Sequence, residues 1–181
     1  MRVGLFIPCY IDQFYPQVAV ATLQLLEKLG CEVGYPLNQT CCGQPMANSG
    51  FASLGKGCDQ NFVRNFKGFD YIVAPSGSCA LHVKEHLESN EDPEEAAHIR
   101  SHIYELTAFI TDMLQVNNIA ASFPYKVGLH NGCHGQRGLH VSSMTELVEP
   151  YFSKPARLLS MVRGLELRQP ERNDECCGFG G

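Results

Sequence analysis

Short apolar runs alternate along this chain with longer stretches whose apolar positions recur at helical spacing. Residues 3–8 form a short apolar run, which is typical of a buried parallel strand. Residues 16–29 place Val18, Leu25 and Leu29 at helical spacing, and Gly30 is a suitable helix stop. The same criteria predict further strands at residues 32–36 and 70–74, and further helices at residues 51–66, 80–87 and 93–116.

The pattern restarts in the second half of the chain. Val3 stands six residues before Cys9, and Val127 stands six residues before Cys133. Each half then runs through a predicted helix and strand to a Cys-Cys-Gly sequence. In the second half the helix and strand are predicted at residues 156–162 and 165–167, and the two Cys-Cys-Gly sequences occupy residues 41–43 and 176–178. This self-similarity indicates an internal duplication, with units of residues 1–122 and 123–181.

Alternation of strands and helices predicts an α/β fold, in which two related units each have a mainly parallel sheet flanked by helices. Ligands of such sheets gather at the carboxyl ends of the strands. Cys9, Cys79 and Cys133 each follow a predicted strand directly, with Cys79 in the turn at residues 75–79. The second unit has no counterpart of Cys79, so we expect it to be truncated, that is, incomplete at its C-terminus.

Nine cysteines are the unusual feature of the composition. The N-terminus has no secretory apolar region, and no stretch approaches the length of a transmembrane helix. We therefore expect a cytoplasmic protein, in which many cysteines favour metal or redox roles over structural disulfides. The net charge of −5 and the pI near 5.8 exclude a typical nucleic-acid binder.

Four cysteines of the first half, Cys9, Cys41, Cys42 and Cys79, come from three loops that this fold brings to one edge of the sheet. Four thiolates can hold an iron–sulfur cluster or a tetrahedral zinc ion, and their spacing does not decide between the two. Cys31 and Cys58 lie within or beside predicted helices, so we interpret them as small apolar residues of the core.

The second half supplies Cys133, Cys176 and Cys177 as metal ligands, with His130 and His134 close to Cys133. Arg137 follows four residues after Cys133. A guanidinium beside a redox centre is suited to bind a substrate carboxylate through two hydrogen bonds, and a salt bridge within the protein is an equally good interpretation. No Walker sequence and no dinucleotide-binding glycine pattern is present.

These residues resemble the cysteine-rich CCG-domain family, whose pattern is one cysteine, Cys-Cys-Gly and Cys-x-x-Cys at long intervals, commonly in two copies. Here thirty-one residues separate Cys9 from Cys41, and thirty-six separate Cys42 from Cys79. Relatives in that family include a cysteine-rich chain of heterodisulfide reductase and the iron–sulfur subunit of glycolate oxidase. The segments Thr40–Pro45, Pro75–Cys79 and His130–Leu139 most resemble its lactate utilization protein A branch.

The resemblance implies a 4Fe-4S cluster on Cys9, Cys41, Cys42 and Cys79, with zinc as the alternative. Ser76 stands where the fuller pattern has a cysteine, which favours one four-iron cluster over a five-cysteine double arrangement. The implied role is electron transfer between partner iron–sulfur or oxidoreductase subunits during oxidation of L-lactate, a small carboxylate, to pyruvate. Such a subunit is not expected to be active alone. Two other functions stay open: thiol–disulfide exchange through Cys41 and Cys42, and a non-catalytic module stapled by zinc.

Overall fold

The computed structural model of the protein describes residues 1–144, 146–171 and 175–178. They form two compact units, one of Met1–Leu106 and one of the described residues from Thr107 onward. The boundary after residue 122, which follows from the repeat, stays a prediction about where the two copies meet.

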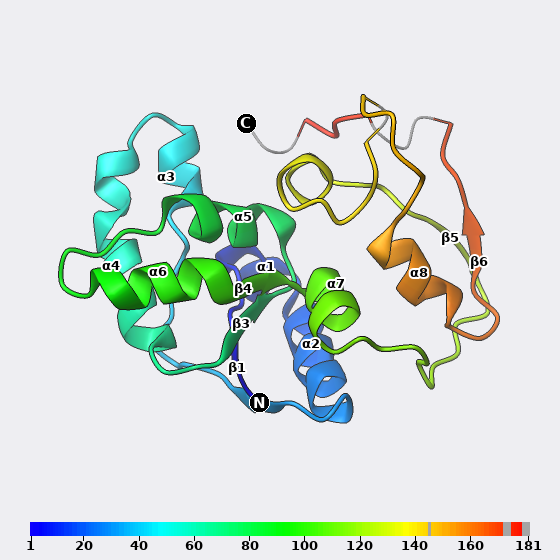
Figure 1. Ribbon diagram of the computed structural model, residues 1–181, viewed down its shortest axis with the longest axis horizontal. Helices are drawn as coiled ribbons and strands as arrows, with labels where there is room; N and C mark the ends of the chain where they lie inside the picture. The colour runs from blue at the N-terminus through cyan, green and yellow to red at the C-terminus, as the bar shows by residue number, and fades with distance from the viewer. Residues whose placement is uncertain (145, 172–174, 179–181) are drawn as a thin grey trace. The chain divides into compact units, whose positions relative to one another are not determined.

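The first unit is built around a four-stranded sheet with the strand order β2-β1-β3-β4 (Figure 1). All three pairs of neighbouring strands are parallel. The strands are β1 (Arg2–Leu5), β2 (Glu32–Gly34), β3 (Tyr71–Ala74) and β4 (Ile103–Glu105). This arrangement confirms the α/β fold that the alternation of elements predicts.

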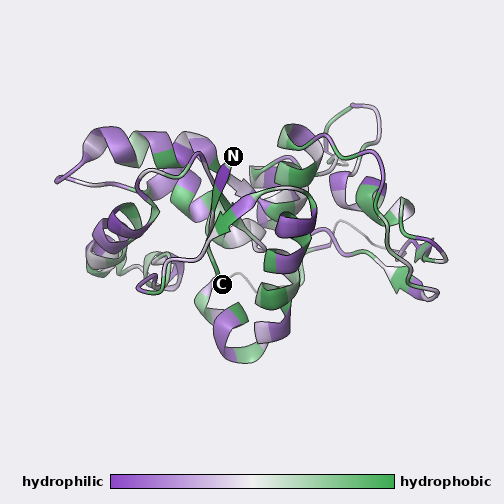
Figure 2. Cartoon of the chain, turned by 90° about the horizontal axis from the view of Figure 1, so that it is seen from below, coloured by the Kyte–Doolittle hydropathy of each residue, from purple (hydrophilic) through white to green (hydrophobic). Residues whose placement is uncertain are grey.

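Helices connect these strands and cover both faces of the sheet. They are α1 (Cys9–Phe14), α2 (Pro16–Lys28), α3 (Gln44–Asn48), the 3₁₀ helix η1 (Ala52–Gly55), α4 (Lys56–Phe66), α5 (Gly77–His86) and α6 (Pro93–His102). The connection from β1 to β2 runs in one direction across the sheet, and the connections from β2 to β3 and from β3 to β4 run in the other. Because such crossovers are right-handed, α2 lies on one face of the sheet and α4 and α6 lie on the other. Figure 1 agrees with this placement. Apolar and polar residues alternate along the helices (Figure 2), as expected for helices with one face on a core.

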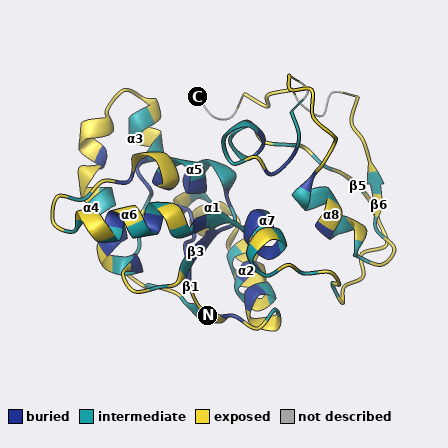
Figure 3. Cartoon of the chain, in the orientation of Figure 1, coloured by how far each residue is buried: buried dark blue, intermediate teal, exposed yellow. Residues whose placement is uncertain are grey.

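Aromatic rings fill the core between α4 and the sheet. Phe6, the residue after β1, lies with its ring centroid 4.8 Å from that of Phe62 and 5.8 Å from that of Phe66. All three side chains are buried, in line with the dark centre of the sheet in Figure 3. The Phe69 ring covers two glycines, Gly4 on β1 and Gly34 on β2. A β-carbon added at Gly4 would lie 3.0 Å from this ring, and one added at Gly34 would lie only 2.6 Å from it.

The single helix predicted for residues 93–116 is wrong. Helix α6 ends at His102, and β4 follows at once and pairs with β3, with Ile103 opposite Ile72. β-branched and aromatic residues at Ile103 and Tyr104 favour a strand, and pairing satisfies the edge of β3. The chain then continues through α7 (Leu106–Ala108) and the π-helical turn η2 (Phe109–Met113).

Two other predictions for the first unit need correction at their edges, and one helix is not predicted at all. Cys79 lies inside the first turn of α5 and not in a turn before the helix. Helix α1, which periodicity does not predict, begins at Cys9 itself. The helix expected at residues 51–66 starts as η1 before α4 continues it. Short helical segments at strand ends escape periodicity arguments because they contain too few residues to show a period.

The second unit repeats the strand, helix and parallel strand with which the first unit begins. Strand β5 (Lys126–Gly128) pairs in parallel with β6 (Glu166–Arg168), and α8 (Lys154–Ser160) precedes β6. Val127 stands opposite Leu167, as Val3 stands opposite Val33 in the first unit. The π-helical turn η3 (His134–Gly138) follows Cys133, as α1 starts at Cys9. The predicted helix and strand are therefore confirmed, with ends shifted by one or two residues.

Candidate metal centre

The loops after three neighbouring strands carry the four cysteines of the first unit. Cys9 follows β1, the pair Cys41 and Cys42 follows β2, and Cys79 follows β3. Because these parallel strands are adjacent in the order β2-β1-β3, their carboxyl ends lie side by side. The fold therefore brings together the four residues that their places in the sequence predict to form one site.

The four thiols form an unbroken series of contacts. The Cys9 thiol donates a hydrogen bond to Cys41 Sγ, and the two sulfurs lie 3.6 Å apart. The Cys42 side chain is hydrogen-bonded to both Cys41 and Cys79. Cys42 and Cys79 are buried, with 4% and 6% of their surface exposed, whereas Cys9 faces solvent. The site thus has a buried end and an open end.

The pKa values of the four cysteines are shifted in opposite directions, so the four side chains do not lose their protons at the same pH. The hydrogen bond from Cys42, together with the Gly43 N–H and the Cys9 thiol, lowers the pKa of Cys41 to about 5. Hydrogen bonding to Cys42 also lowers the pKa of Cys79. Partial shielding from water and the hydrogen bond to Cys41 raise the pKa of Cys9 to about 11. The hydrogen bonds that Cys42 makes to Cys41 and Cys79 raise the pKa of Cys42. Cys41 is therefore a thiolate at neutral pH, and Cys42 donates to both Cys41 and Cys79.

A tight turn follows the cysteine pair. Gly43 has a φ of 89°, a left-handed conformation that glycine adopts without strain. Its N–H donates to Cys41 Sγ at 3.5 Å. Two side chains line the back of the turn: a β-carbon at Gly43 would lie 3.7 Å from Cys58 Cβ and 3.7 Å from His82 Nε2. Cys58, which the sequence places in the core, is half-buried and lies beside the site.

Cys79 is also held by the serines around it. The side chains of Ser76 and Ser78 hydrogen-bond to its sulfur and lower its pKa. Ser76 is the residue that replaces a cysteine of the fuller family pattern, and only 6% of it is exposed. The Ser76 hydroxyl therefore hydrogen-bonds to Cys79 Sγ from the position where the family pattern has another cysteine.

A smaller cluster occurs in the second unit. A hydrogen bond to Cys176 raises the pKa of Cys133, and the Gly178 N–H, followed by the Cys133 thiol, lowers the pKa of Cys176. The Gly178 N–H donates to Cys176 Sγ at 3.3 Å. Cys177 is exposed, and no contact with the other two sulfurs is seen in the described residues of this unit. The structure thus brings together two of the three cysteines predicted here.

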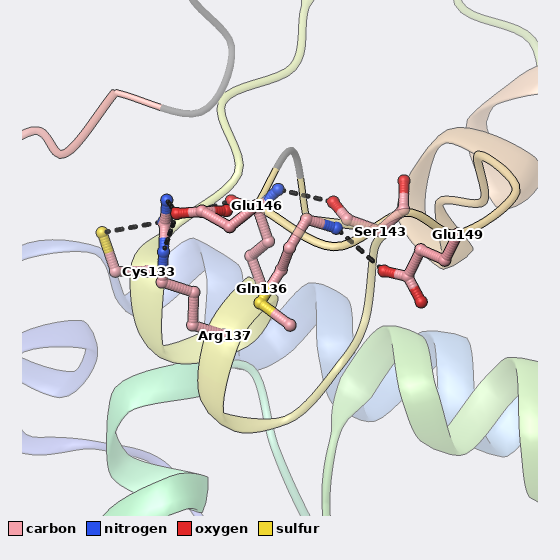
Figure 4. Close-up of polar contacts among 7 residues, drawn as sticks. Cys133, Gln136, Arg137, Ser143, Glu146 and Glu149 are labelled. Carbon is pink, nitrogen blue, oxygen red and sulfur yellow. Dashed lines mark hydrogen bonds and ion pairs between the residues drawn. The ribbon is translucent and has the colours of Figure 1, made fainter.

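Arg137 lies between a thiol and a carboxylate (Figure 4). Its Nη1 is 3.9 Å from Cys133 Sγ, and its Nε donates to Glu146 Oε1 at 3.0 Å. Its Nη2 also pairs with the Glu146 carboxylate. The structure therefore shows the salt bridge within the protein, one of the two interpretations that the sequence leaves open for Arg137, and binding of a substrate carboxylate stays a prediction.

Comparison with known proteins gives a consistent result. Residues 3–84 and 127–181 match the family described as CCG, cysteine-rich domain. Lactate utilization protein A of Geobacillus kaustophilus is 43% identical over the whole chain, which spans 73% of that relative. The protein of the same name from Bacillus subtilis is 38% identical, again over the whole chain and 74% of the relative.

The chain belongs to the lactate utilization protein A family of CCG-domain proteins. The two matched segments correspond to the two units of the repeat, so the duplication predicted from the sequence is confirmed. Each segment contains one Cys-Cys-Gly sequence and the cysteine that follows the first strand of its unit, Cys9 or Cys133.

The donor set of the first unit fits a metal–thiolate centre in its chemistry, since four cysteine side chains converge and the pKa values of Cys41 and Cys79 are lowered. Zn–S bonds of about 2.3 Å hold the sulfurs of a tetrahedral ion about 3.8 Å apart, close to the 3.6 Å between Cys9 and Cys41. A four-iron cluster is larger than a single ion, so these two sulfurs would separate around it. Within residues 1–144, 146–171 and 175–178 no three such side chains already stand as a formed metal site.

Proposed function

We propose that this chain is an iron–sulfur subunit that carries electrons in a complex oxidising L-lactate, a 2-hydroxy acid, to pyruvate. Cys9, Cys41, Cys42 and Cys79 would bind the cluster, because four thiolates are the ligand complement of one 4Fe-4S cluster. The observation that carries the proposal is the continuous series of contacts from the exposed Cys9 to the buried Cys79.

When bound, the cluster would supply one-electron transfer. The surrounding residues would tune it through hydrogen bonds to the sulfurs, which the Gly43 N–H makes to Cys41 and the Ser76 hydroxyl makes to Cys79. Burial of Cys42 and Cys79 keeps water away from one side of the centre, whereas the exposed Cys9 marks the side that a redox partner can reach.

The partners we propose are the other iron–sulfur or oxidoreductase subunits of a lactate-oxidising complex. The relatives carry lactate utilization in their names. No dinucleotide-binding glycine pattern is found in the sequence, so another chain would supply the hydride chemistry and this chain would not be active alone.

The location we propose is the cytoplasm. Nine cysteines in a chain of this length favour a reducing compartment, in which cysteines serve as metal or redox ligands more often than as disulfides. Separately, within the described residues no helix is long and apolar enough to cross a membrane.

Arg137 is our proposed contact for the small carboxylate substrate. The guanidinium is planar and already holds the Glu146 carboxylate, so its geometry suits a carboxylate ligand. A substrate would have to displace Glu146 to bind in the same way. The second cluster of cysteines, at Cys133 and Cys176, would then lie within reach of that substrate, because Arg137 Nη1 is 3.9 Å from Cys133 Sγ.

Thiol–disulfide exchange is a second candidate function, favoured by one observation. Cys41 has a pKa of about 5 and stands beside Cys42, so at neutral pH it is a nucleophilic thiolate next to a second thiol. In that case Cys41 and Cys42 would cycle between dithiol and disulfide without metal. A zinc ion that only stabilises the fold is the corresponding non-redox alternative, favoured by the short distance between Cys9 and Cys41.

Anaerobic purification followed by iron, sulfide and zinc analysis, with visible and EPR spectra, tests the proposal. We expect iron and acid-labile sulfide in matching amounts, retained in Cys31→Ser and lost in Cys42→Ser. Cys31 is a fair control because it is buried just before β2 begins, whereas the thiol series follows the strand ends. Zinc alone, or no metal after reconstitution with iron and sulfide, would refute the cluster, and metal-independent reduction of a disulfide would favour thiol exchange.

A further inference from the structure

The side-chain amide of Gln39 joins the two segments that lead to Cys9 and Cys41. Its Oε1 accepts a hydrogen bond from the Ile7 N–H at 2.8 Å. Its Nε2 donates to the Leu5 carbonyl at 3.1 Å and to the Pro36 carbonyl at 3.0 Å. Gln39 stands two residues before Cys41, and Ile7 stands two residues before Cys9. One side chain therefore connects the backbones on which both sulfurs depend.

The Gln39 side-chain amide continues the hydrogen-bond ladder between β1 and β2 beyond the point where the backbone of β2 can supply an N–H donor. The register pairs Val3 with Val33 and Gly4 with Gly34, so Pro36 would come opposite Phe6. A parallel partner at that place would donate an N–H to the carbonyl before Phe6 and accept from the N–H after it. Proline has no N–H to donate. Gln39 supplies both the missing donor and the acceptor.

The segment around Gln39 is also held from its other side. Asn61, on α4, donates through Nδ2 to the Asn38 carbonyl at 2.9 Å and to Thr40 Oγ1 at 3.1 Å. The residues before and after Gln39 are thus tied to a helix, while Gln39 itself is tied to the end of β1. The backbone that leads into Cys41 has little freedom to move relative to the sheet.

We propose that Gln39 is a positioning residue of the metal centre, which sets the separation of Cys9 and Cys41 and so governs how firmly the site holds its metal. This inference depends on the proposed function of the site as a metal–thiolate centre. Gln39 acts through the two cysteines and not by contact with the metal. Removing a group that hydrogen-bonds directly to a metal ligand commonly changes metal affinity about 10–100-fold, and because Gln39 acts through the backbone, we expect an effect at the lower end of that range.

The test compares Gln39→Glu with Gln17→Glu. Glutamate at position 39 keeps the shape and the acceptor for the Ile7 N–H, loses the Nε2 donor and sets a carboxylate against two carbonyl oxygens. Gln17 is an exposed residue of α2, where the same change touches nothing of the site. We expect Gln39→Glu to lose iron, or zinc if zinc is bound, to a chelator about tenfold faster than the unmodified protein. Gln17→Glu should lose metal at the unmodified rate.

A second measurement needs no metal, so it separates failure of this inference from failure of the proposed function. In metal-free protein carrying Cys42→Ser and Cys79→Ser, diamide oxidises Cys9 and Cys41 to a disulfide and takes up their two protons and two electrons. Mass spectrometry of the linked peptides follows the rate. We expect it to be several times slower with Gln39→Glu than with Gln17→Glu. Equal rates would overturn the inference, even in a protein that binds no metal.

Folding is monitored by far-ultraviolet circular dichroism in both experiments. Gln39→Met, which keeps the length of the side chain and removes its polar groups, serves as the second variant. Native spectra with altered chelation and disulfide rates support a positioning role. Loss of the native spectrum in both Gln39 variants would show that Gln39 is required for folding and would overturn the inference.

Discussion

Gly43 and Gly178 share a left-handed backbone conformation, with φ values of 89° and 74°, directly after the two cysteine pairs. Each donates its N–H to the sulfur two residues before it, at 3.5 Å to Cys41 and at 3.3 Å to Cys176. The duplicated sequence therefore reproduces one local geometry, in which the first cysteine of each pair receives a backbone hydrogen bond.

Gly43→Ala should strain this turn, because a side chain at positive φ costs roughly 1–2 kcal/mol. Gly30 has almost the same φ, 87°, at the end of α2, so Gly30→Ala is the matched control. We expect both variants to lose about 1–2 kcal/mol in the free energy of unfolding, measured in urea. Only Gly43→Ala should also release metal faster to a chelator. Equal chelation rates in the two variants would contradict a role of the turn in the site.

The metal-free protein should gain stability as the pH rises from about 5 to 9. The folded pKa of Cys41, about 5, lies below its ordinary value of 9.0, so its contribution is full above pH 9 and is lost as the pH falls through 5. Cys9 acts in the opposite sense: its pKa of about 11 gives stability below pH 9 that is lost toward pH 11. Urea titrations across this range should show a weaker rise in Cys41→Ser. An unchanged rise would mean that Cys41 is not the thiolate.

Metal affinity should rise with pH for a related reason. Cys9 and Cys42 hold protons in the metal-free site, and both must lose them to bind a metal. We expect zinc binding to release protons, measured by calorimetry in buffers of different ionisation enthalpy. Binding without proton release would show that all four sulfurs are already deprotonated.

Glu146→Gln should make Arg137 more available to a small carboxylate, because the neutral amide pairs less strongly with the guanidinium. Glu149 offers the matched control, since its carboxylate accepts from the Met144 N–H at 3.0 Å and is a separate contact in Figure 4. We expect L-lactate to bind more tightly to Glu146→Gln than to Glu149→Gln in calorimetric titrations. Equal affinities would remove Arg137 as the proposed substrate contact.

Phe66→Ala should destabilise the first unit by about 3–5 kcal/mol, the usual cost of removing a fully buried phenylalanine. The Phe66 ring is 0% exposed and stacks on Phe62 with a centroid distance of 4.4 Å. Phe51 is 59% exposed, so Phe51→Ala should change the free energy of unfolding by less than about 0.5 kcal/mol. Urea denaturation compares the two, and equal losses would show that the core is not centred on Phe66.

The sequence predicts the sheet of the first unit well up to β3, because β1 and β3 are mostly buried and largely apolar. It does not predict β4, since residues 93–116 resemble one helix when each residue is judged against its near neighbours. The strand forms through pairing with β3, with Ile103 opposite Ile72, a contact between positions far apart in the chain. Local periodicity carries no information about such a partner.

The ligands of the candidate site can be predicted from the sequence, and their surroundings cannot. Strand ends place Cys9, Cys41 and Cys79 together because parallel strands align their carboxyl ends. The sequence does not single out Gln39, because a glutamine in a loop is an ordinary polar residue. Its role becomes visible only in the structure, where Pro36 has no N–H for the Leu5 carbonyl on β1 and Gln39 supplies that donor. Cys58 is assigned to the core for a similar reason, since only the folded turn shows that it lies behind Gly43.

The ring of Phe69 over Gly4 and Gly34 restricts which residues can replace these glycines, and Phe66, 2.9 Å from a β-carbon added at Gly4, restricts Gly4 further. A β-carbon at Gly34 would lie 2.6 Å from the ring, so a larger residue there forces the ring out of its place. A smaller side chain at position 69 would make room for it, with loss of the ring's contact with Arg2, 5.2 Å from the ring centroid. Substitutions at these sites are therefore expected to be compensatory: Gly34→Ala should be poorly tolerated alone and rescued by Phe69→Leu.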